Sequence, residues 1–441
     1  MTSTRRKVND LLSPRVGFHY FPDTDHYTQK DLATWLPIFQ QLRTAWLVLS
    51  SNAARAIPEY FISSLVDAGI KPIVHMRLPL PNSPSAKELK PLFTAYNRWG
   101  VKHMILFDQP NNMQSWAASG WVQQDLVERF IDRYLPLASA VANAGMTPIF
   151  PPLEPGGSYW DISFLKQSLQ SLRRRGYSNL IDRMGLASYA FTYHHDLDYG
   201  LGGPEKWPNT MPYVKSPESQ DQRGFRNYEW LQSAVRSAIG RELPTFLLGA
   251  GIKEPGAAYS PEAHAGICLN ILELLNNTSS ENALPEYVQN CNFYTLCAEP
   301  GTPDFVHAWF RSEDEVLPIV DLLLNVHLGK DASFVKGANV DETTDFSRFV
   351  ADHPIEHYLL LPLYDWGVAE YHLEVTRPFV QRHHPTVGFS IEEAALAKKV
   401  TVIGGDQTFP EEQLARLRAG GSIVERITGD GISIATQLAE R

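Results

Sequence analysis

The sequence predicts an α/β protein: a (β/α)8 TIM barrel over residues 1–329, a linker over 330–356 and a small doubly wound α/β domain over 357–441. Two observations predict the barrel. From residue 15 onward, short apolar runs alternate with longer amphipathic stretches, which is typical of parallel βα units. Eight such units follow one another over about 300 residues, the size of a (β/α)8 barrel. An open nucleotide-binding sheet is the weaker alternative, because no early strand precedes a Gly-x-Gly-x-x-Gly turn.

The eight predicted strands are short runs rich in β-branched and aromatic residues. They are RVGFHYF (15–21), TAWLVLS (44–50), KPIVHMR (71–77), KHMILFD (102–108), MTPIFPP (146–152), DRMGLASYA (182–190), LPTFLLG (243–249) and NFYTLCA (292–298). The amphipathic stretches between them end near a Gly that can cap a helix, as in 58–69, 126–145, 164–176 and 228–240.

A second alternation of apolar runs and helical stretches follows the polar linker. Its predicted strands are 357–363, 386–390, 400–405 and 422–427, and its predicted helices are 368–383, 391–399, 410–421 and 433–441. Four short strands with helices between them predict a doubly wound domain of about the smallest size that can carry its own core.

Composition and charge exclude several classes of protein. Residues of both charge signs are interspersed and the formal net charge is -10, so the chain has no basic surface for nucleic acid. No segment approaches about 18 consecutive apolar residues, which argues against a membrane span. The basic start is not followed by an apolar signal segment, so we expect a cytoplasmic protein, although a sequence trimmed of its signal would look the same.

The residues just after the barrel strands are expected to line the active face. They combine aromatic rings, amides, carboxylates and cations, which suits a sugar, because its C–H faces stack on rings while its hydroxyls pair with polar groups. The candidate carbohydrate-binding residues are His19, Asn52, His75, Arg77, Gln109, Asn111, Tyr189, Tyr193, Glu254, Glu299 and Trp309. Asp108 and Glu154, after the fourth and fifth strands, are the candidate catalytic carboxylates.

A long loop follows the sixth strand. Residues 193–230 exceed an ordinary βα turn, and long loops at a barrel mouth are typically functional. Trp207 in this loop joins the candidate sugar-binding residues; the alternative is that its ring only packs the loop onto the barrel. His194 and His195 are adjacent on an extended segment and therefore point to opposite sides, so the sequence predicts no metal and no other cofactor.

Several stretches resemble the clan A glycoside hydrolases over roughly residues 15–325. They are GFHYFPD, an arginine at the end of the third strand, DQPNN after the fourth, the aromatic run after the sixth and FVHAWFR after the last. The resemblance implies a general acid/base Glu in an Asn-Glu-Pro motif after strand four and a nucleophilic Glu after strand seven. The chemistry of that clan needs two carboxylates about 5–5.5 Å apart.

The sequence departs from that pattern at both positions. Gln109 stands where the acid/base is expected, and an amide cannot release a proton to a leaving group. Strand seven ends in Gly249, Ala250 and Gly251, and the nearest carboxylate, Glu254, comes later.

Three hypotheses follow. The favoured one is a degenerate glycosidase that binds a carbohydrate without cutting it, in which Asp108 and Glu154 only accept hydrogen bonds from sugar hydroxyls. The second is an active glycosidase that uses Asp108 and Glu154 as acid and base. The third is a structural or surface-assembly protein that binds no sugar. The sequence leaves open the sugar, the linkage and the oligomeric state.

The tail, residues 400–441, is similar to one unit of the cell wall binding repeat of type 2. The resembling features are a strand followed by Gly404 and Gly405, a helix with Leu414 and Leu417, VERITGDG and the closing IATQLA. The resemblance implies a location at the cell surface, against the cytoplasmic expectation. The alternative is a generic flavodoxin-like half, in which the two glycines only permit the turn from strand to helix.

Overall fold

The computed structural model describes residues 13–121, 124–193, 195–210, 221–253, 260–276, 282–311, 315–328, 353, 355–362, 370–383 and 385–439. The chain divides into two compact units, Met1–Gly337 and Ala338–Arg441, which are treated separately. Most of the predicted linker 330–356 lies outside the described residues. No described helix is both long enough and apolar enough to span a lipid bilayer.

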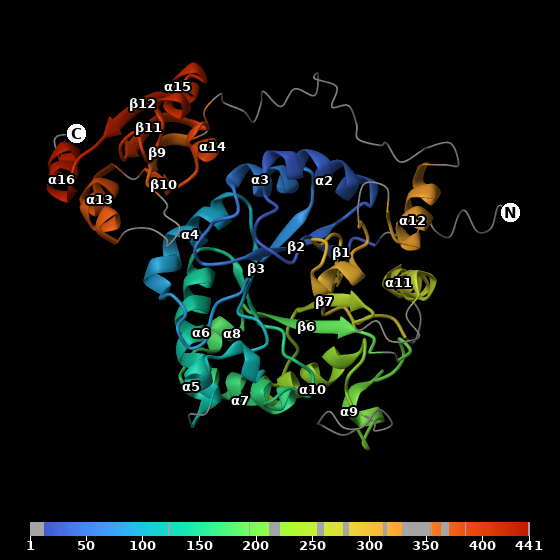
Figure 1. Ribbon diagram of the computed structural model, residues 1–441. Coiled ribbons are helices and arrows are strands. Elements are labelled where there is room, and N and C mark those ends of the chain that lie inside the picture. Colours follow the sequence, from blue (N-terminus) through green and yellow to red (C-terminus); the bar gives the residue numbers. More distant parts are fainter. Residues whose placement is uncertain are drawn as a thin grey trace. The chain divides into compact units, whose positions relative to one another are not determined.

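The first unit is a closed barrel of eight parallel strands in sequence order, which confirms the predicted fold class (Figure 1). The strands are β1 (Val16–His19), β2 (Trp46–Ser51), β3 (Lys71–Met76), β4 (His103–Leu106), β5 (Thr147–Phe150), β6 (Gly185–Phe191), β7 (Thr245–Gly251) and β8 (Val288–Phe293). β1 pairs with β8 through Val16 to Phe18, and this pairing closes the barrel.

The last strand differs from its prediction. β8 lies at Val288–Phe293, whereas the apolar run at 292–298 was expected to form it. The strand contains Asn290 and Asn292, and both side chains are fully buried. The Asn292 amide donates to the carbonyl of Leu247 on β7 (2.8 Å), so this polar group is buried with a partner. Hydrophobic patterning misplaced β8 because the strand carries polar residues inside the barrel.

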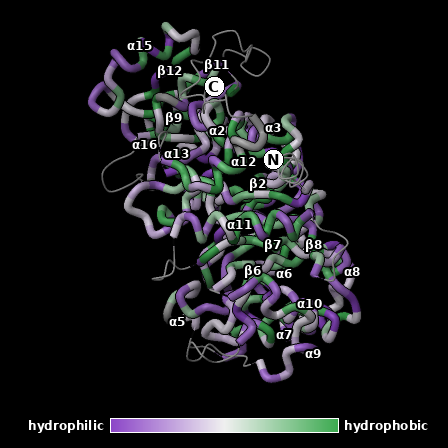
Figure 2. Tube along the Cα trace, turned by 90° about the vertical axis from the view of Figure 1, so that its right-hand side faces the viewer, coloured by the Kyte–Doolittle hydropathy of each residue, from purple (hydrophilic) through white to green (hydrophobic). Residues whose placement is uncertain are grey.

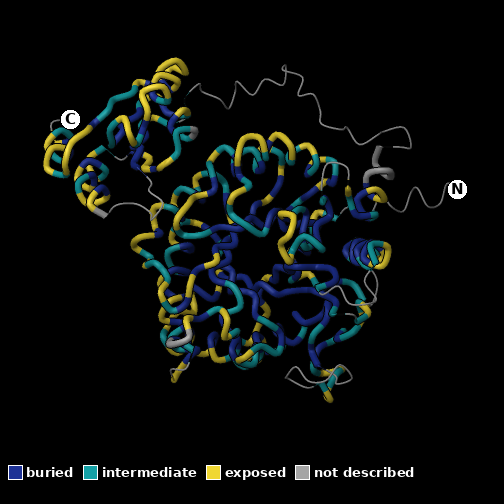
Figure 3. Tube along the Cα trace, in the orientation of Figure 1, coloured by how far each residue is buried: buried dark blue, intermediate teal, exposed yellow. Residues whose placement is uncertain are grey.

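Buried side chains form two layers around the sheet. The interior of the barrel is filled by one cluster of ten buried residues: Trp46, Val48, Ile73, Ile105, Ile149, Ala187, Tyr189, Phe191, Phe246 and Leu248. A second and larger cluster lies between the strands and the outer helices. Figure 3 shows the strands buried and the outward faces of the helices exposed. Because the barrel interior is packed, ligands have access only to its ends.

The helices of this unit are α2 (Gln29–Gln41), α3 (Glu59–Asp67), α4 (Ala86–Arg98), α5 (Ala118–Trp121), α6 (Leu126–Asn143), α7 (Asp161–Arg174), α8 (Ser178–Ile181), α9 (Gly203–Lys206), α10 (Asn227–Ile239), α11 (Pro261–Asn276) and α12 (Pro318–Leu328). Hydrophobic and hydrophilic residues alternate along them (Figure 2). Two begin with capping boxes, Thr28 with Asp31 and Ser85 with Glu88, in which each side chain accepts the other residue's backbone N–H.

The second unit contains a parallel four-stranded sheet in the order β10-β9-β11-β12, which confirms the predicted α/β class. Its elements are β9 (Ile355–Leu360), α13 (Glu370–His383), β10 (Thr386–Gly388), α14 (Ile391–Ala394), β11 (Ala397–Ile403), α15 (Glu411–Ala419), β12 (Ile423–Ile427) and α16 (Gly431–Ala439). The helix expected at 391–399 ends at Ala394, and residues 397–399 begin β11. One buried cluster lies on each face of the sheet. The consecutive residues Tyr358 and Leu359 of β9 point to opposite faces, so one belongs to each cluster.

Candidate functional site

Asp108 lies just after β4 at the carboxyl end of the barrel strands. Its Oδ1 accepts a hydrogen bond from the Tyr189 hydroxyl on β6 (2.8 Å), and its Oδ2 lies 3.7 Å from Nε of Arg77 after β3. Its neighbours Phe107 and Gln109 both adopt left-handed backbone conformations, with φ of 69° and 45°. Such conformations cost of order 1 kcal/mol each and cluster at functional sites. The Asp108 side chain is 25% exposed, so it can reach a ligand.

Glu154, after β5, is the second carboxylate of the mouth. Nζ of Lys253, after β7, lies 3.0 Å from its Oε1 and 3.3 Å from its Oε2, and the Gln109 amide donates to Oε2. The Glu154 side chain is 22% exposed. The two consecutive residues after β4 contact different partners: Asp108 contacts Tyr189 and Arg77, and Gln109 contacts Glu154. The structure therefore brings both candidate catalytic carboxylates to one end of the barrel.

Aromatic rings surround the two carboxylates. The Tyr189 and Phe191 rings stack 5.6 Å apart, and Phe191 also contacts Tyr193 (6.2 Å) and Tyr294 (5.8 Å). Nζ of Lys253 lies 5.2 Å from the Tyr193 ring centroid. Burial and the Asp108 charge raise the pKa of Tyr189 well above its ordinary value, so its hydroxyl remains a donor to that carboxylate. The cluster therefore combines charged groups with apolar ring faces.

His19 and His75 lie deeper in the barrel than the carboxylates. The backbone amide of Gly249 donates to Nε2 of His19 (3.2 Å), and Nε2 of His75 donates to the carbonyl of Phe107 (2.9 Å). Burial lowers the pKa of both imidazoles, and for His75 it outweighs the nearby Asp108 charge, which raises the pKa. Both rings are therefore neutral at physiological pH and act as hydrogen-bonding groups rather than charges.

Asn111 contacts the backbone of another loop and not the mouth. It is fully buried; its amide nitrogen donates to the carbonyls of Glu154 (2.8 Å) and Tyr159 (3.0 Å), and its Oδ1 accepts from the Glu154 amide (2.9 Å). Asn52 likewise accepts from the amides of Ala54 and Arg55 in its own loop. Both residues were expected to bind a sugar, and the structure engages both in holding loops.

Two predicted residues lie away from the carboxylates. The Trp309 ring is fully buried and packs edge-on against Phe18 (4.9 Å). β8 ends at Phe293, well before Trp309 in the chain. Trp207 packs within the loop after β6: its ring lies 4.8 Å from Tyr199 and its indole donates to the carbonyl of Leu201. Among the residues that the structure describes, neither ring forms a ring contact or hydrogen bond with Asp108 or Glu154. Glu254 lies outside the described residues.

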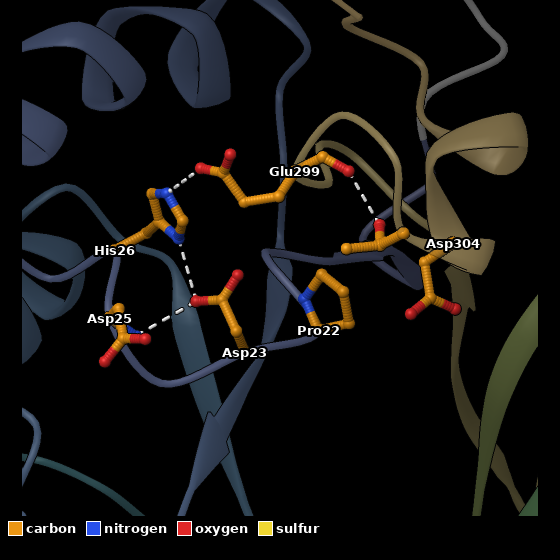
Figure 4. A pocket seen from close by; sticks show the side chains of 7 residues that line it. Pro22, Asp23, Asp25, His26, Glu299 and Asp304 are labelled. Carbon is orange, nitrogen blue, oxygen red and sulfur yellow. Dashed lines mark hydrogen bonds and ion pairs between the residues drawn. The ribbon is translucent and has the colours of Figure 1, made fainter.

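Glu299 lines a separate pocket of about 450 Å³ between the loops after β1 and β8 (Figure 4). The lining residues are Pro22, Asp23, Asp25, His26, Glu299, Thr302 and Asp304. His26 connects the two loops, with its ring nitrogens 2.8 Å from Asp23 and 2.7 Å from Glu299. Burial lowers the pKa of His26, but the hydrogen bonds to these carboxylates outweigh burial and raise it overall.

This pocket adjoins the Asp108 cluster. Arg77 donates to the carbonyl of Pro22 (3.2 Å), and the Tyr294 hydroxyl donates to Asp304 (2.6 Å). Tyr294 was missed because the predicted strand 292–298 placed it inside β8, and Asp304, in the loop that follows, was not among the predicted residues. A strand ending at Phe293 places Tyr294 at the mouth, so an earlier boundary for β8 is the signal that would have found it.

The end of β7 has no carboxylate. Gly249 has φ of 64°, and a Cβ there would come within 2.6 Å of the Phe191 ring, so the backbone conformation and the space both require glycine. Lys253 is the charged residue that this strand contributes to the cluster. Within the described part of the chain, no group of three or more His, Cys, Asp or Glu side chains is arranged to hold a metal ion.

No protein-family model and no curated protein matches the sequence, so the similarity of the tail to a cell wall binding repeat stays a prediction. The structure is similar to several glycoside hydrolases. An endo-β-1,3-glucanase from Sorangium cellulosum aligns at 14% identity and a TM-score of 0.40, over 71% of this chain and 98% of that one. A β-xylosidase from Caulobacter crescentus aligns at 11% and 0.44, over 71% and 68%. A rhamnosyl-glucuronidase from Fusarium oxysporum aligns at 10% and 0.42, over 72% and 69%. At these identities the similarities are of fold alone, and a function for this chain depends on its own mouth residues.

Proposed function

We propose that the carboxyl end of the barrel binds a saccharide and that it lacks the acid and nucleophile of clan A hydrolases. The observation that supports this proposal is the cluster in which Asp108 and Glu154 are held by side chains from four strand ends. Gln109, Tyr189 and Lys253 donate hydrogen bonds to these carboxylates, and Arg77 forms an ion pair with Asp108. Such a rigid set of donors and acceptors is what recognition of sugar hydroxyls requires.

The arrangement can bind a sugar in two ways at once. The carboxylates, each about a quarter exposed, can accept hydrogen bonds from sugar hydroxyls while they keep their protein donors. The partly exposed rings of Tyr193 and Tyr294 offer apolar faces for the C–H surface of a pyranose. A site of this kind selects by the direction of hydroxyl groups.

Hydrolysis by the usual pair is disfavoured by the chemistry of the side chains present. The Gln109 amide has no acidic proton to transfer to a leaving group, and its N–H donates a hydrogen bond to Glu154. Lys253 also donates to Glu154, so that carboxylate receives donors on both oxygens. Both oxygens of Glu154 are therefore occupied by protein donors, which a leaving-group oxygen would have to displace.

Hydrolysis by Asp108 and Glu154 is the second candidate. It is favoured by one observation: these carboxylates follow adjacent strands, β4 and β5, and Gln109 beside Asp108 contacts Glu154. Two carboxylates on one side of a bound sugar are what glycoside hydrolysis needs. In this case a ligand would have to displace Lys253 or Gln109 before Glu154 could act as an acid.

The test measures saccharide binding by isothermal titration calorimetry with soluble β-1,3- and β-1,4-glucans, xylan and mannan. We expect the intact chain to bind at least one of them, and Asp108→Asn to weaken this binding by about tenfold or more, because the amide repels a donor that the carboxylate accepted. Asp67→Asn, at the exposed end of α3, is the matched control and should bind normally.

The same samples distinguish the two candidates. Release of reducing ends that disappears in both Asp108→Asn and Glu154→Gln would establish the hydrolase and overturn the degenerate site. If no saccharide binds to the intact chain at high concentration, the proposal fails altogether.

A further inference from the structure

Asp161 is a buried carboxyl group with no part in the cluster described above. It is the first residue of α7 and has no solvent exposure. Its Oδ1 accepts hydrogen bonds from the backbone amide of Gly156 (3.1 Å) and from the side-chain amide of Gln222 (2.9 Å). Its Oδ2 is buried and has no partner among the described residues. A buried oxygen without a partner is costly if the group is charged.

The two partners of Asp161 belong to segments that carry the mouth. Gly156 follows Glu154 by two residues, in the loop that Asn111 also holds. Gln222 precedes Arg223, whose guanidinium lies 5.9 Å from the Tyr193 ring. One oxygen of Asp161 therefore joins the loop of Glu154 to the segment that reaches Tyr193.

The surroundings of Asp161 favour its uncharged form. Burial raises the pKa of Asp161 to about 7, although the amides of Gly156, Asp161 and Ile162 and the Gln222 side chain lower it. The charged side chains of the segments around it are engaged elsewhere: Glu154 with Lys253, Arg223 with Asp221, and Arg226 with Tyr228 and the carbonyl of Leu197. No ion pair of Asp161 occurs among the described residues to offset the cost of its charge.

We propose that Asp161 is a positioning residue that makes the saccharide site sensitive to pH: its uncharged side chain accepts the two bonds that join the Glu154 loop to the segment at Gln222. Ionisation strengthens each bond, but the larger cost of a buried charge favours a looser arrangement in which water hydrates the carboxylate. The inference rests on the proposed function, because it concerns the same site. In the looser arrangement, Glu154 and the segment that contacts Tyr193 are no longer held at a fixed distance from each other.

The direction of the effect follows from linkage. An exposed Asp ionises near pH 3.9, whereas Asp161 ionises near pH 7 in the closed structure. The closed arrangement is therefore favoured fully below about pH 4, loses this advantage progressively as the pH rises to about 7, and changes no further above that. A variant that cannot ionise at this position does not lose stability in this way.

The experiment compares the intact chain with Asp161→Asn, which keeps an acceptor oxygen but carries no charge. Saccharide affinity is measured between pH 4.5 and 8. We expect the intact chain to lose about tenfold in affinity between pH 5 and 7 and then to level off, whereas Asp161→Asn changes by no more than about twofold. Asp67→Asn should follow the intact chain.

A second measurement does not depend on any ligand. Urea unfolding midpoints are measured at the same pH values. The midpoint of Asp161→Asn minus that of the intact chain should increase from pH 5 to 7 and stay constant above pH 7; this difference is called the lead of the variant. A lead that is equally large at every pH, or none at any pH, overturns the role of Asp161. Absence of saccharide binding with the pH-dependent lead present overturns the proposed function instead.

A further variant covers the case in which Asp161→Asn does not fold. Gln222→Leu removes one of the two bonds and leaves Asp161 able to ionise. We expect this variant to bind the saccharide about fivefold more weakly at pH 5 and to keep the pH dependence of the intact chain. Unchanged affinity at pH 5 would show that the bond between Gln222 and Asp161 does not position the site, and the proposal would fail.

Discussion

Replacing Asn111 with Ala is expected to lower the free energy of unfolding by about 3 kcal/mol and to weaken saccharide binding by at least about tenfold. The change removes three hydrogen bonds to buried backbone: two to the carbonyls of Glu154 and Tyr159 and one from the Glu154 amide. Each lost bond between the buried Asn111 side chain and the backbone costs about 1 kcal/mol, although the Glu154 carbonyl still accepts from the Gly157 amide. The loop that presents Glu154 would lose its side-chain bonds to Asn111 and keep the bonds from Gln109 to Pro152 and Glu154.

Asn112→Ala is the matched control, because Asn112 is the next residue and only accepts from the Gln114 amide (3.0 Å). Its cost should be no more than about 1 kcal/mol, the usual range for a capping side chain, with normal binding. Urea unfolding and titration calorimetry measure both variants. Equal effects of the two substitutions would contradict the role given to Asn111.

Replacing Gly17 with Ala is expected to destabilise the barrel by more than about 4 kcal/mol or to prevent folding. A Cβ at this position of β1 would lie 2.2 Å from Oδ1 of Asn292, 2.7 Å from Cβ of Trp46 and 2.8 Å from the backbone oxygen of Trp46. The last of these atoms belongs to the neighbouring strand and cannot move without breaking the pairing of Gly17 with Trp46. Relief would require separating β1 from β2.

Gly266→Ala tests whether this cost comes from crowding and not from the loss of a glycine. Gly266 lies within α11, and nothing lies within 4 Å of a Cβ placed there. The substitution should therefore stabilise the chain by about 0.5–1 kcal/mol, the difference in helix propensity between the two residues. Thermal unfolding followed by circular dichroism measures both variants. A well-folded Gly17→Ala with a similar midpoint would refute the crowding.

Much of the fold could be predicted because the other seven barrel strands are rich in apolar residues. β3 and β7, for example, lie within three residues of their expected bounds. β8 could not be placed in the same way, since Asn290 and Asn292 are buried inside the barrel and break its apolar pattern. Its misplacement also led to Trp309 being expected at the mouth.

The candidate site was predictable to the level of strand ends and no further. The rule that residues after barrel strands line one face placed Asp108, Gln109 and Glu154 together. That rule does not say which way a side chain turns, so it could not distinguish Asn111, which contacts backbone, from its neighbour Gln109. Whether these residues contact a saccharide stays a prediction.

The ion pairs at the mouth also bear on its electric field. Arg77 lies beside Asp108, Lys253 beside Glu154 and Arg223 beside Asp221, so each cation has a carboxylate within 4 Å. The fields of two opposite charges this close largely cancel at a distance. Salt screens what remains beyond the Debye length of about 8 Å at physiological ionic strength. These three pairs therefore exert little long-range attraction on an approaching sugar. Selection takes place at contact, where the orientation of each hydroxyl group decides which molecule stays.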